Sequence, residues 1–462
     1  MVVEFGAGTR VHIIGVGGAG MSAIARVLAQ RGCLVTGSDA AHAERLPALA
    51  AAGISVRVGH DAHAIQTQCP DVVLASTAVP EDDVELQAAR AAKVEVIRRP
   101  EATALLTQNW RNLAISGTHG KTTTSSMLTL IMRAAGIDCS YLLGSELHAT
   151  GVNAHEGLAP WAVVEADESD GTALHVRAEA VAVTNVDADH LDRWGSFDKM
   201  KDVFNEFVSG AHGHTPTLAA VCADDPGAAS LVVPPGVTRV SYGFTDAADV
   251  RVVSMGEHSD GCEFVVSGHL ELRARTRVPG RHNVLNAVAA SVLASHAGVG
   301  SQAVADGLDH YHGARRRFEL RGSAAGVRVF DDYAHHPTAV AATLSAARSV
   351  TQGRVVVLCQ PYRWYRTAMF VREYADVLAA ADWAVLVDVY GPGEQPIAGA
   401  GAADIAAAAR ANGANVDYAP SKAAAVSLLT SEVRDSDIIL TLGGEDIRPV
   451  GLDLLQVLRG SA

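Results

Sequence analysis

Residues 117–124 read GTHGKTTT, a short glycine-containing stretch that ends in a lysine followed by threonines. A phosphate-binding P-loop ends in the same way, because its backbone N–H groups and its lysine hold phosphates while the next hydroxyl faces Mg²⁺. The common spacing, G-x-x-x-x-G-K-[ST], would place the first glycine at position 115, where the chain has Ile115. A strand-like segment precedes the loop and a helical segment follows it. We therefore interpret residues 117–122 as a shorter, working P-loop rather than as a structural turn.

Two acidic runs follow later strand-like segments of the same region. The run EADESD contains Glu165, Asp167, Glu168 and Asp170, and the run NVDADHLD contains Asp187, Asp189, His190 and Asp192. The carboxyl ends of parallel strands meet at one edge of a sheet, and Mg²⁺ that bridges phosphates accepts one or two protein carboxylates. Either run alone is equally compatible with a solvated loop. Together, behind a P-loop, they predict a metal–nucleotide site in which His190 is an unusual ligand for a hard cation.

A second glycine-rich turn lies near the N-terminus. Residues 15–20 read GVGGAG, a complete G-x-G-x-x-G between a strand-like and a helical segment, and Asp39 ends the next strand-like segment. Such a turn lets a diphosphate lie against the start of a helix. Taken alone it indicates a Rossmann domain that binds NAD. The geometry captures a diphosphate without selecting the nucleoside, and a purely structural tight turn is the alternative.

The segments that must position these groups alternate between short apolar runs and helical stretches, which is the pattern of parallel sheets covered by helices. In the first segment we predict strands at 11–18, 33–39, 54–60 and 71–77 and a helix at 20–30. In the second we predict strands at 112–117, 161–167, 180–187 and 218–225, a helix from 121, a β-rich insertion at 237–278 and a helix at 283–297. In the third we predict strands at 327–337, 353–361, 383–391 and 437–444, with 398–414 as a loop entering a surface helix. The predicted fold class is α/β with three domains, 1–108, 109–312 and 313–462.

Length and composition agree with this division. A chain of 462 residues exceeds the roughly 250–300 residues at which single cores stop growing. Its 48% hydrophobic and 19% charged residues are typical of a chain that folds into globular domains. Its net charge of -14 argues against nucleic acid as a partner. Neither a signal peptide nor an apolar run of about 20 residues is apparent, so we expect no membrane partner. The six cysteines are scattered without a C-x-x-C, which is typical of reduced thiols in a cytoplasmic protein.

Seven motifs in order resemble the Mur ligase family, nearly from end to end. They are HIIGVGGAGMSAIA (12–25), GTHGKTTT (117–124), EADESD (165–170), TNVDADHLD (184–192), PGRHNVLNA (279–287), RRRFE (315–319) and DDYAHHPT (331–338). The resemblance implies that the compact P-loop is the family's own form. It also implies a Rossmann-like N-terminal domain for UDP-N-acetylmuramate, a central P-loop ATPase-type domain for ATP, and a C-terminal Rossmann-like domain that receives the amino acid, L-alanine in the branch matched best.

Residue roles follow from the resemblance, position by position. The UDP-sugar residues would be Gly15, Gly17, Gly18, Ala19, Ser38, Asp39 and Ser76; the ATP residues Gly117, Thr118, His119, Gly120, Lys121, Thr122, Thr123, His282, Asn283, Asn286, Arg317 and Asp332; the Mg²⁺ ligands Thr122, Glu168 and His190; the amino-acid residues Tyr333, His335, Arg363 and Arg366; and the catalytic residues Lys121, Glu168, His190, Arg317, His335 and His336. His335 or His336 would deprotonate the incoming amine. The alternative for this pair is a helix start packed beside Pro337.

The implied chemistry is ATP-dependent amide formation through an acyl phosphate, which needs positioning and charge neutralisation rather than a protein nucleophile. The chain departs from the family pattern at Tyr362, where histidine is usual, and at Glu445, in a usually glycine-rich stretch. Phe204-Asn205 stands where sister enzymes carry a carbamylated lysine, so we predict no carbamate. We expect a monomer or a weak homodimer. The alternatives are a recycling ligase that joins a murein peptide to UDP-N-acetylmuramate, an NAD-dependent oxidoreductase and a non-catalytic nucleotide-binding protein.

Overall fold

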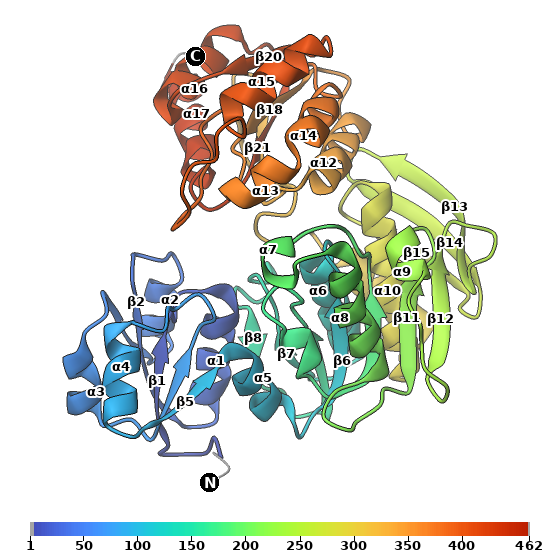
Figure 1. Ribbon diagram of the computed structural model, residues 1–462. Coiled ribbons are helices and arrows are strands. Elements are labelled where there is room, and N and C mark those ends of the chain that lie inside the picture. The colour runs from blue at the N-terminus through green and yellow to red at the C-terminus, as the bar shows by residue number, and fades with distance from the viewer. Residues whose placement is uncertain (1–3, 461–462) are drawn as a thin grey trace.

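The computed structural model describes residues 4–460, which form three α/β units, each built on its own sheet. In Figure 1 the N-terminal unit lies at the lower left, the central unit at the lower right, and the C-terminal unit above both. The predicted fold class, three α/β domains, is confirmed.

The N-terminal sheet is fully parallel, with the strand order β3-β2-β1-β4-β5. Its strands are β1 (Arg10–Ile14), β2 (Leu34–Asp39), β3 (Ser55–Val58), β4 (Val72–Ala75) and β5 (Glu95–Arg98), and its helices are α1 (Ala19–Gln30), α2 (Leu46–Ala51), α3 (Ala62–Gln68), α4 (Val84–Ala91) and α5 (Arg99–Thr107). The chain leaves central β1 through the glycine turn and enters α1. The turn therefore lies where the strand order reverses, which is where open α/β sheets bind ligands.

The central sheet is mixed, with the order β15-β14-β13-β12-β11-β10-β6-β9-β7-β8. Its strands are β6 (Arg111–Ser116), β7 (Ser140–Leu142), β8 (Ala154–His155), β9 (Trp161–Glu165), β10 (Ala178–Val183), β11 (Leu218–Cys222), β12 (Thr238–Gly243), β13 (Val250–His258), β14 (Gly261–Gly268) and β15 (Leu272–Thr276). Strand β12 pairs in parallel with β11, so only β13–β15 of the predicted β-rich insertion form an antiparallel meander. The P-loop follows β6, and the two acidic runs follow β9 and β10, its direct neighbours.

The helices of the central unit include α6, which begins directly at the P-loop lysine, and α10, which packs against it. Their bounds are α6 (Lys121–Ala134), α7 (Leu191–Trp194), α8 (Phe197–Ser209), α9 (Pro226–Ala229), α10 (Arg281–His296) and α11 (Ser301–Asp309), with a 3₁₀ turn at Thr172–Leu174. Burial of α6 is nearly continuous from Thr122 to Met132, so the helix that anchors the P-loop is held on all sides.

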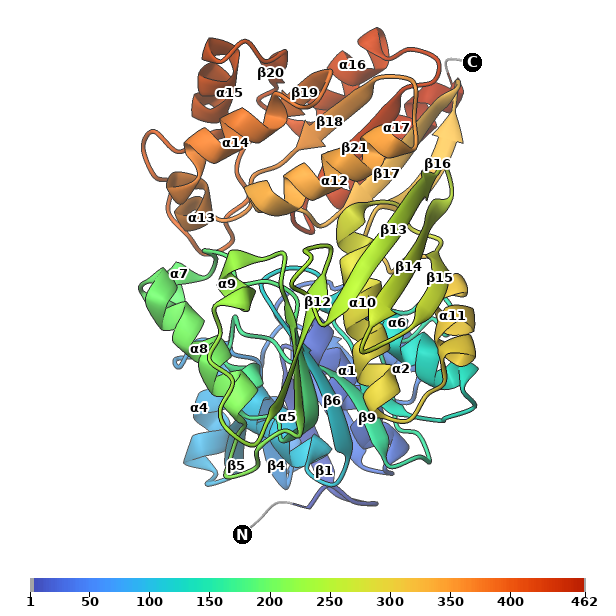
Figure 2. The same ribbon diagram turned by 90° about the vertical axis from the view of Figure 1, so that its right-hand side faces the viewer.

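The C-terminal sheet has the order β16-β17-β21-β18-β19-β20, parallel except for the edge strand β16. Its strands are β16 (Glu319–Ala324), β17 (Val327–Asp332), β18 (Val355–Cys359), β19 (Trp383–Leu386), β20 (Val416–Tyr418) and β21 (Ile438–Leu442), and its helices are α12 (Pro337–Ser349), α13 (Trp364–Met369), α14 (Val371–Leu378), α15 (Ala402–Ala411), α16 (Lys422–Glu432) and α17 (Arg448–Gly460). The strand predicted at 327–337 ends earlier, at Asp332, because α12 begins at Pro337. In Figure 2 this unit lies above the central one, with α12 and α13 at the junction.

None of the helices in the described part of the chain is long and apolar enough to cross a membrane. The six cysteines are all free thiols, and all but Cys69 are buried. This agrees with the prediction that the cysteines form no disulfide framework.

Candidate active site

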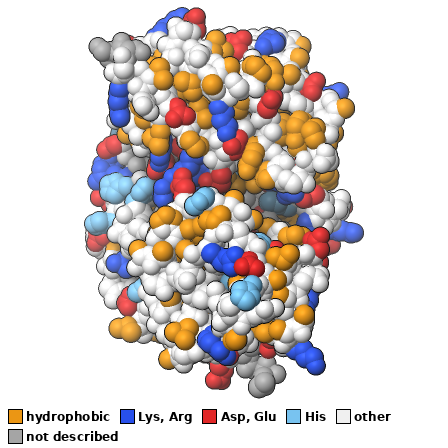
Figure 3. All heavy atoms as spheres, turned by 90° about the vertical axis from the view of Figure 1, so that its left-hand side faces the viewer, with side chains coloured by type: hydrophobic (Ala, Val, Ile, Leu, Met, Phe, Trp, Pro, Cys, Tyr) orange, Lys and Arg blue, Asp and Glu red, His pale blue; other side chains and the backbone are white. Residues whose placement is uncertain are grey.

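A cavity of about 1110 Å³ lies between the three units and is lined by residues of all of them. On the face shown in Figure 3, basic, histidine and acidic side chains gather in the band between the upper and lower parts of the molecule. Most of the predicted site residues line this cavity: Gly17, Gly18, Ala19, Asp39, Thr118, His119, Gly120, Lys121, Thr122, Thr123, His190, His282, Asn283, Asn286, Arg317, Asp332, Tyr333, His335, His336, Arg363 and Arg366. Of the described residues that we predicted, Gly15, Ser38, Ser76, Gly117 and Glu168 lie outside the lining.

The P-loop needs both of its glycines. Gly117 has φ +131° and Gly120 has φ +85°, in the region that side chains other than glycine rarely adopt. A Cβ on Gly117 would overlap the hydroxyl of Thr184, and a Cβ on Gly120 would lie 2.5 Å from Oδ1 of Asn286. The loop is therefore packed tightly between the β10 end and α10, and its amides at Thr118 and His119 donate to the carbonyl oxygen and to Oδ1 of Asn185, at 3.1 and 2.8 Å.

Lys121 lies across its own loop. Its Nζ donates to the carbonyl oxygen of Gly117 at 2.7 Å and to Oε2 of Glu168 at 2.6 Å. Burial lowers the pKa of Lys121, but Glu168 and neighbouring carboxylates outweigh this effect and raise it, so the ammonium stays charged. A cation held in a phosphate-binding loop is the arrangement that stabilises β- and γ-phosphates.

Glu168 is the fully buried member of the first acidic run. Burial raises the pKa of Glu168 to about 8, with help from Asp167 and against the lowering effect of Lys121. Its Oε1 atom is buried and has no hydrogen-bond partner among residues 4–460. An unpartnered carboxylate oxygen beside a P-loop fits a cation ligand, since cationic charge brought to it would favour the ionised form.

Arginines from the flanking units hold three of the other carboxylates of the two acidic runs. In the first run, Asp167 accepts from Arg99 of α5 at 2.8 Å, and Asp170 also pairs with Arg99. In the second run, Asp189 forms a two-pronged pair with Arg366 of α13, at 2.8 and 3.1 Å. Glu168 instead pairs with the P-loop lysine, Lys121.

His190 follows Asp189 and has a left-handed backbone, with φ 54°. Burial lowers the pKa of His190, although Asp189 opposes the shift, so the imidazole is neutral at pH 7 and able to bind a metal. Thr122 donates its hydroxyl to Oε1 of Glu165 at 3.0 Å, and Glu165 accepts the amide of Gly144 at 2.7 Å. Glu165 therefore orients the threonine hydroxyl, a role that the sequence did not reveal.

The start of α10 closes one side of the P-loop. Asn286 accepts from the Thr124 hydroxyl at 3.2 Å and donates to Asn283 at 3.3 Å, while Asn283 donates to the carbonyl of Pro279 at 2.7 Å. Burial lowers the pKa of His282 to about 4. These predicted adenine-side residues also brace the loop, so they have a structural role as well.

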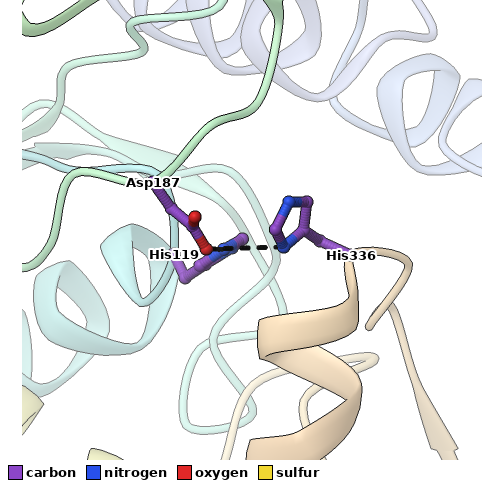
Figure 4. Close-up of side chains that lie close together, drawn as sticks. All are labelled: His119, Asp187 and His336. Carbon is purple, nitrogen blue, oxygen red and sulfur yellow. Dashed lines mark hydrogen bonds and ion pairs between the residues drawn. The ribbon is translucent and has the colours of Figure 1, made fainter. Parts of the chain in front are cut away.

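The two histidines after β17 face different neighbours. His335 donates Nδ1–H to the carbonyl of Tyr333 at 2.6 Å, and its ring lies edge-on to Tyr362 with a centroid distance of 5.4 Å. His336 is the N-cap of α12 and lies 3.5 Å from Oδ2 of Asp187 (Figure 4). Burial lowers the pKa of both: His336 to about 4, with help from His119, and His335 to well below its usual range.

Of the arginines in the RRRFE motif, one stabilises the fold and another lies at the cavity wall. Arg316 is buried and binds Asp331 at 3.1 Å and the carbonyl oxygens of Gly443 and Gly444. The guanidinium of Arg317 lies 5.7 Å from the ring centre of Tyr333, at the cavity wall. The carboxylate of Asp332 accepts the amides of Phe318 and Ala334, each at 2.8 Å, so it fixes the turn beside Arg317.

The two departures from the family pattern lie close together. A Cβ on Gly444 would be 2.8 Å from the Tyr362 ring, and the next residue, Glu445, lies 3.2 Å from Nη1 of Arg316. The Tyr362 side chain also lies near Arg366, with 5.9 Å between the guanidinium and the ring centre. Both departures therefore line the part of the cavity predicted for the amino acid.

At the N-terminal glycine turn, Asp39 accepts the amide of Gly17 at 2.9 Å, so its carboxylate faces the turn itself. The first intrahelical bond of α1 runs from the Ser22 amide to the carbonyl of Gly18, which leaves the amides of 19–21 for a ligand. The Ser38 hydroxyl instead pairs with buried Glu85, away from the cavity. Gly15 packs against Ser76, and a Cβ on this glycine would lie 2.9 Å from the serine Cβ.

Several residues that line the cavity carry no motif that would have marked them in the sequence. Arg99 follows β5, and its guanidinium lies against Gly20 of the glycine turn. Glu44 of the N-terminal unit pairs with Arg448 of α17 and, at 3.6 Å, with Arg315, which does belong to the RRRFE motif. The second acidic run did mark Asp187 and Asp189 in the sequence. Their partners could not be predicted, because these lie far away along the chain.

Three regions of the chain match family descriptions: residues 10–111 match "Mur ligase family, catalytic domain", 115–294 "Mur ligase middle domain" and 316–444 "Mur ligase, glutamate ligase domain". The chain is 42% identical to a UDP-N-acetylmuramate–L-alanine ligase of Mycobacterium sp. (strain JLS), over 98% of this chain and 96% of the relative. The crystal structure of a UDP-N-acetylmuramate-alanine ligase from Thermotoga maritima superimposes with a TM-score of 0.83 at 25% identity, covering 98% of this chain and all of the other. A murein peptide ligase from Psychrobacter arcticus has a TM-score of 0.71 at 23% identity, with 98% and 99% covered.

Proposed function

The chain belongs to the Mur ligase family, and we propose that it uses ATP to join L-alanine to the carboxylate of UDP-N-acetylmuramate in peptidoglycan precursor synthesis. The full-length similarity to ligases of that name carries the proposal. The cavity supports it, because the P-loop, the glycine turn and the Arg366 region open into one space. A nicotinamide enzyme would leave the P-loop and both acidic runs without a role.

The reaction needs activation of a carboxylate, whose direct acyl transfer would expel oxide. A carboxylate oxygen of the sugar attacks the γ-phosphorus of ATP and ADP leaves, which gives an acyl phosphate. The neutral amine of L-alanine then attacks the acyl carbon, expels phosphate and loses a proton to form the amide. Enzymes of this kind work mainly by positioning and by neutralising charge on the transferred phosphoryl group.

Each unit supplies one part of that arrangement in our proposal. Residues 1–108 hold the UDP-sugar, with its diphosphate at Gly17, Gly18 and Ala19. Residues 109–312 hold ATP, with Lys121 on the β- and γ-phosphates. Residues 313–462 hold L-alanine near Arg363 and Arg366 and bring Arg317 toward the phosphoryl group. The buried charge of Lys121 is supported by its pairing with Glu168 at 2.6 Å.

The residues present fit a divalent cation, because the buried Oε1 of Glu168 has no hydrogen-bond partner within the described residues and His190 is neutral. Thr122, Glu168 and His190 would hold Mg²⁺, which when bound to ATP neutralises phosphate charge and lets the anionic sugar approach. Glu165 keeps the Thr122 hydroxyl oriented through its 3.0 Å hydrogen bond.

The proton of the amine needs an acceptor, and the histidine pair is a weak one. The lowered pKa values of His335 and His336 keep both rings neutral, yet they also make each ring a poor base for an ammonium group. His335 lies beside Arg366 and Tyr362, so we assign it to orienting the amino acid. His336 faces the P-loop side instead.

Phosphate release tests the proposal. Purified protein is given ATP and Mg²⁺ with and without UDP-N-acetylmuramate, together with L-alanine, glycine, L-serine or the peptide L-Ala-γ-D-Glu-diaminopimelate. We expect release that requires the UDP-sugar and is fastest with L-alanine. Release with the peptide and none with L-alanine would make the chain a recycling ligase.

A further inference from the structure

Three side chains with metal-binding atoms meet at the junction between the central and C-terminal units. His119 comes from the P-loop, Asp187 from the loop after β10, and His336 from the N-cap of α12. The ligand atoms of all three lie within 4.8 Å of one another, and their side chains point toward a common centre (Figure 4). None of them belongs to the predicted Mg²⁺ ligand set.

The spacing of these atoms suits a tetrahedral ion. Ligands about 2.0–2.1 Å from a zinc ion in tetrahedral geometry are separated from one another by roughly 3.3 Å. Nε2 of His119 lies 3.2 Å from Oδ2 of Asp187, and Nδ1 of His336 lies 3.5 Å from the same oxygen. Two of the three distances between ligand atoms therefore already match those of a tetrahedral zinc site.

Hydrogen bonding leaves one of these contacts unexplained. Nδ1 of His336 accepts the backbone N–H of Thr338 at 3.3 Å, so its proton is on Nε2. The Nδ1 lone pair then faces a carboxylate oxygen, and two acceptors oppose each other. Nε2 of His336 is buried, in a residue that is 3% exposed, and no group in the described part of the chain bonds to it. A cation between Nδ1 and the carboxylate would remove this conflict, and the amide of Thr338, an exposed residue, would bond to water instead.

The donor set selects the kind of ion. Two imidazole nitrogens and one carboxylate suit Zn²⁺, Co²⁺ or Ni²⁺, whereas Mg²⁺ prefers an all-oxygen shell. The side chains of His119 and Asp187 are 21% and 28% exposed, so water can occupy a fourth position. We propose that His119, Asp187 and His336 form a site for a zinc-like divalent cation that links the P-loop to α12.

Zinc titration of the full-length protein tests this site. Protein freed of metal by a chelator is titrated calorimetrically with Zn²⁺ in excess Mg²⁺, without nucleotide, and Co²⁺ is added separately to record the visible absorption of a tetrahedral complex. We expect one zinc ion per chain, and affinity at least about tenfold lower in His336→Gln and in Asp187→Asn, because each loses a ligand. His190→Gln, in the predicted Mg²⁺ set, and His63→Gln, on the exposed start of α3, should bind Zn²⁺ like the parent protein.

The variants make the result decisive. Circular dichroism identifies any variant that does not fold, and Asp187→Asn, whose side chain is partly exposed, serves if loss of the buried His336 ring disrupts α12. The proposal is overturned if the parent protein does not bind Zn²⁺ in excess Mg²⁺. It is equally overturned if folded Asp187→Asn binds with unchanged affinity, or if His190→Gln abolishes binding.

Discussion

At the scale of single residues, the buried carboxylates of the site differ in the side chains that they pair with. The carboxylates of Asp167 and Asp189 are bound by arginines from neighbouring units, whereas Glu168 pairs with the P-loop lysine. The sequence motif marked every acid in these runs as an equal candidate. The tertiary contacts separate the acids that are bound by arginines from Glu168.

Lys121→Ala is expected to lower turnover by a factor on the order of 10²–10³, because the charge facing the phosphates is lost. The fold should survive, since burial raises the pKa of Glu168 and lets its carboxyl group take up a proton once the lysine is gone. Calorimetry should show UDP-N-acetylmuramate binding close to that of the parent. Lys199→Ala, at an exposed position of α8, is the matched control and should keep full turnover. Equal turnover in both variants would refute the P-loop assignment.

At the scale of elements, the close packing of the P-loop can be tested by substituting one of its glycines. Gly117→Ala is expected to lower the midpoint of thermal unfolding and to weaken ATP binding, because the residue has φ +131° and its Cβ would overlap Thr184. Gly300→Ala is the control, since Gly300 precedes α11 with an ordinary φ of -74° and open space around it. Calorimetric melting and nucleotide titration would compare them, and equal effects would contradict the packing described.

The pair between the second acidic loop and α13 joins two units. Asp189 and Arg366 are 6% and 5% exposed, and removing one partner of a buried pair costs about 3–5 kcal/mol. Asp189→Asn should therefore shift the free protein toward an open arrangement with a larger radius of gyration in solution scattering. Asp192→Asn breaks a pair whose side chains are 30% and 34% exposed, worth at most about 1 kcal/mol, and should scatter like the parent. Superimposable curves for all three proteins would exclude this role.

The elements themselves were predicted unevenly. Buried strands such as β6, β9 and β18 are continuous apolar runs, so the sequence located them. Edge strands β8, β16 and β20 and the short helix α2 are brief and partly exposed, and no periodicity distinguishes them from loops. Strand β12 was placed with the insertion because its parallel pairing with β11 is set by the sheet and not by its composition.

At the scale of the whole molecule, stability should depend on pH through histidines that are buried neutral. Burial lowers the pKa of His282 and His336 to about 4 from the usual 6.5, so between these values the unfolded chain binds more protons than the folded one. The free energy of unfolding should fall as the pH drops from about 6.5 to 4, by about 1–3 kcal/mol per histidine. Denaturant unfolding measured across this pH range should show a smaller decrease in the free energy of unfolding for His282→Asn than for the parent protein. If the free energies of the two proteins fall in parallel, the burial of that ring as a neutral group is contradicted.

The arrangement of the three units was the part that the sequence could not supply. Contacts such as Glu44 with Arg448 and Asp189 with Arg366 join segments far apart in the chain, and neither partner belongs to a pattern that indicates the other. Local motifs did place the P-loop and the glycine turn, because each is encoded within a few residues. How they share one cavity depends on packing between units.

One cavity couples ATP cleavage to amide formation on a sugar acid, and transfer of an ¹⁸O label from the sugar to phosphate would reveal this coupling. UDP-N-acetylmuramate labelled with ¹⁸O in its carboxylate is incubated with ATP, Mg²⁺ and L-alanine, and the released phosphate is analysed by mass spectrometry. We expect one ¹⁸O atom in each phosphate released, because the sugar oxygen attacks the γ-phosphorus. Unlabelled phosphate formed together with the amide, or ATP cleavage that ignores the sugar, would contradict it.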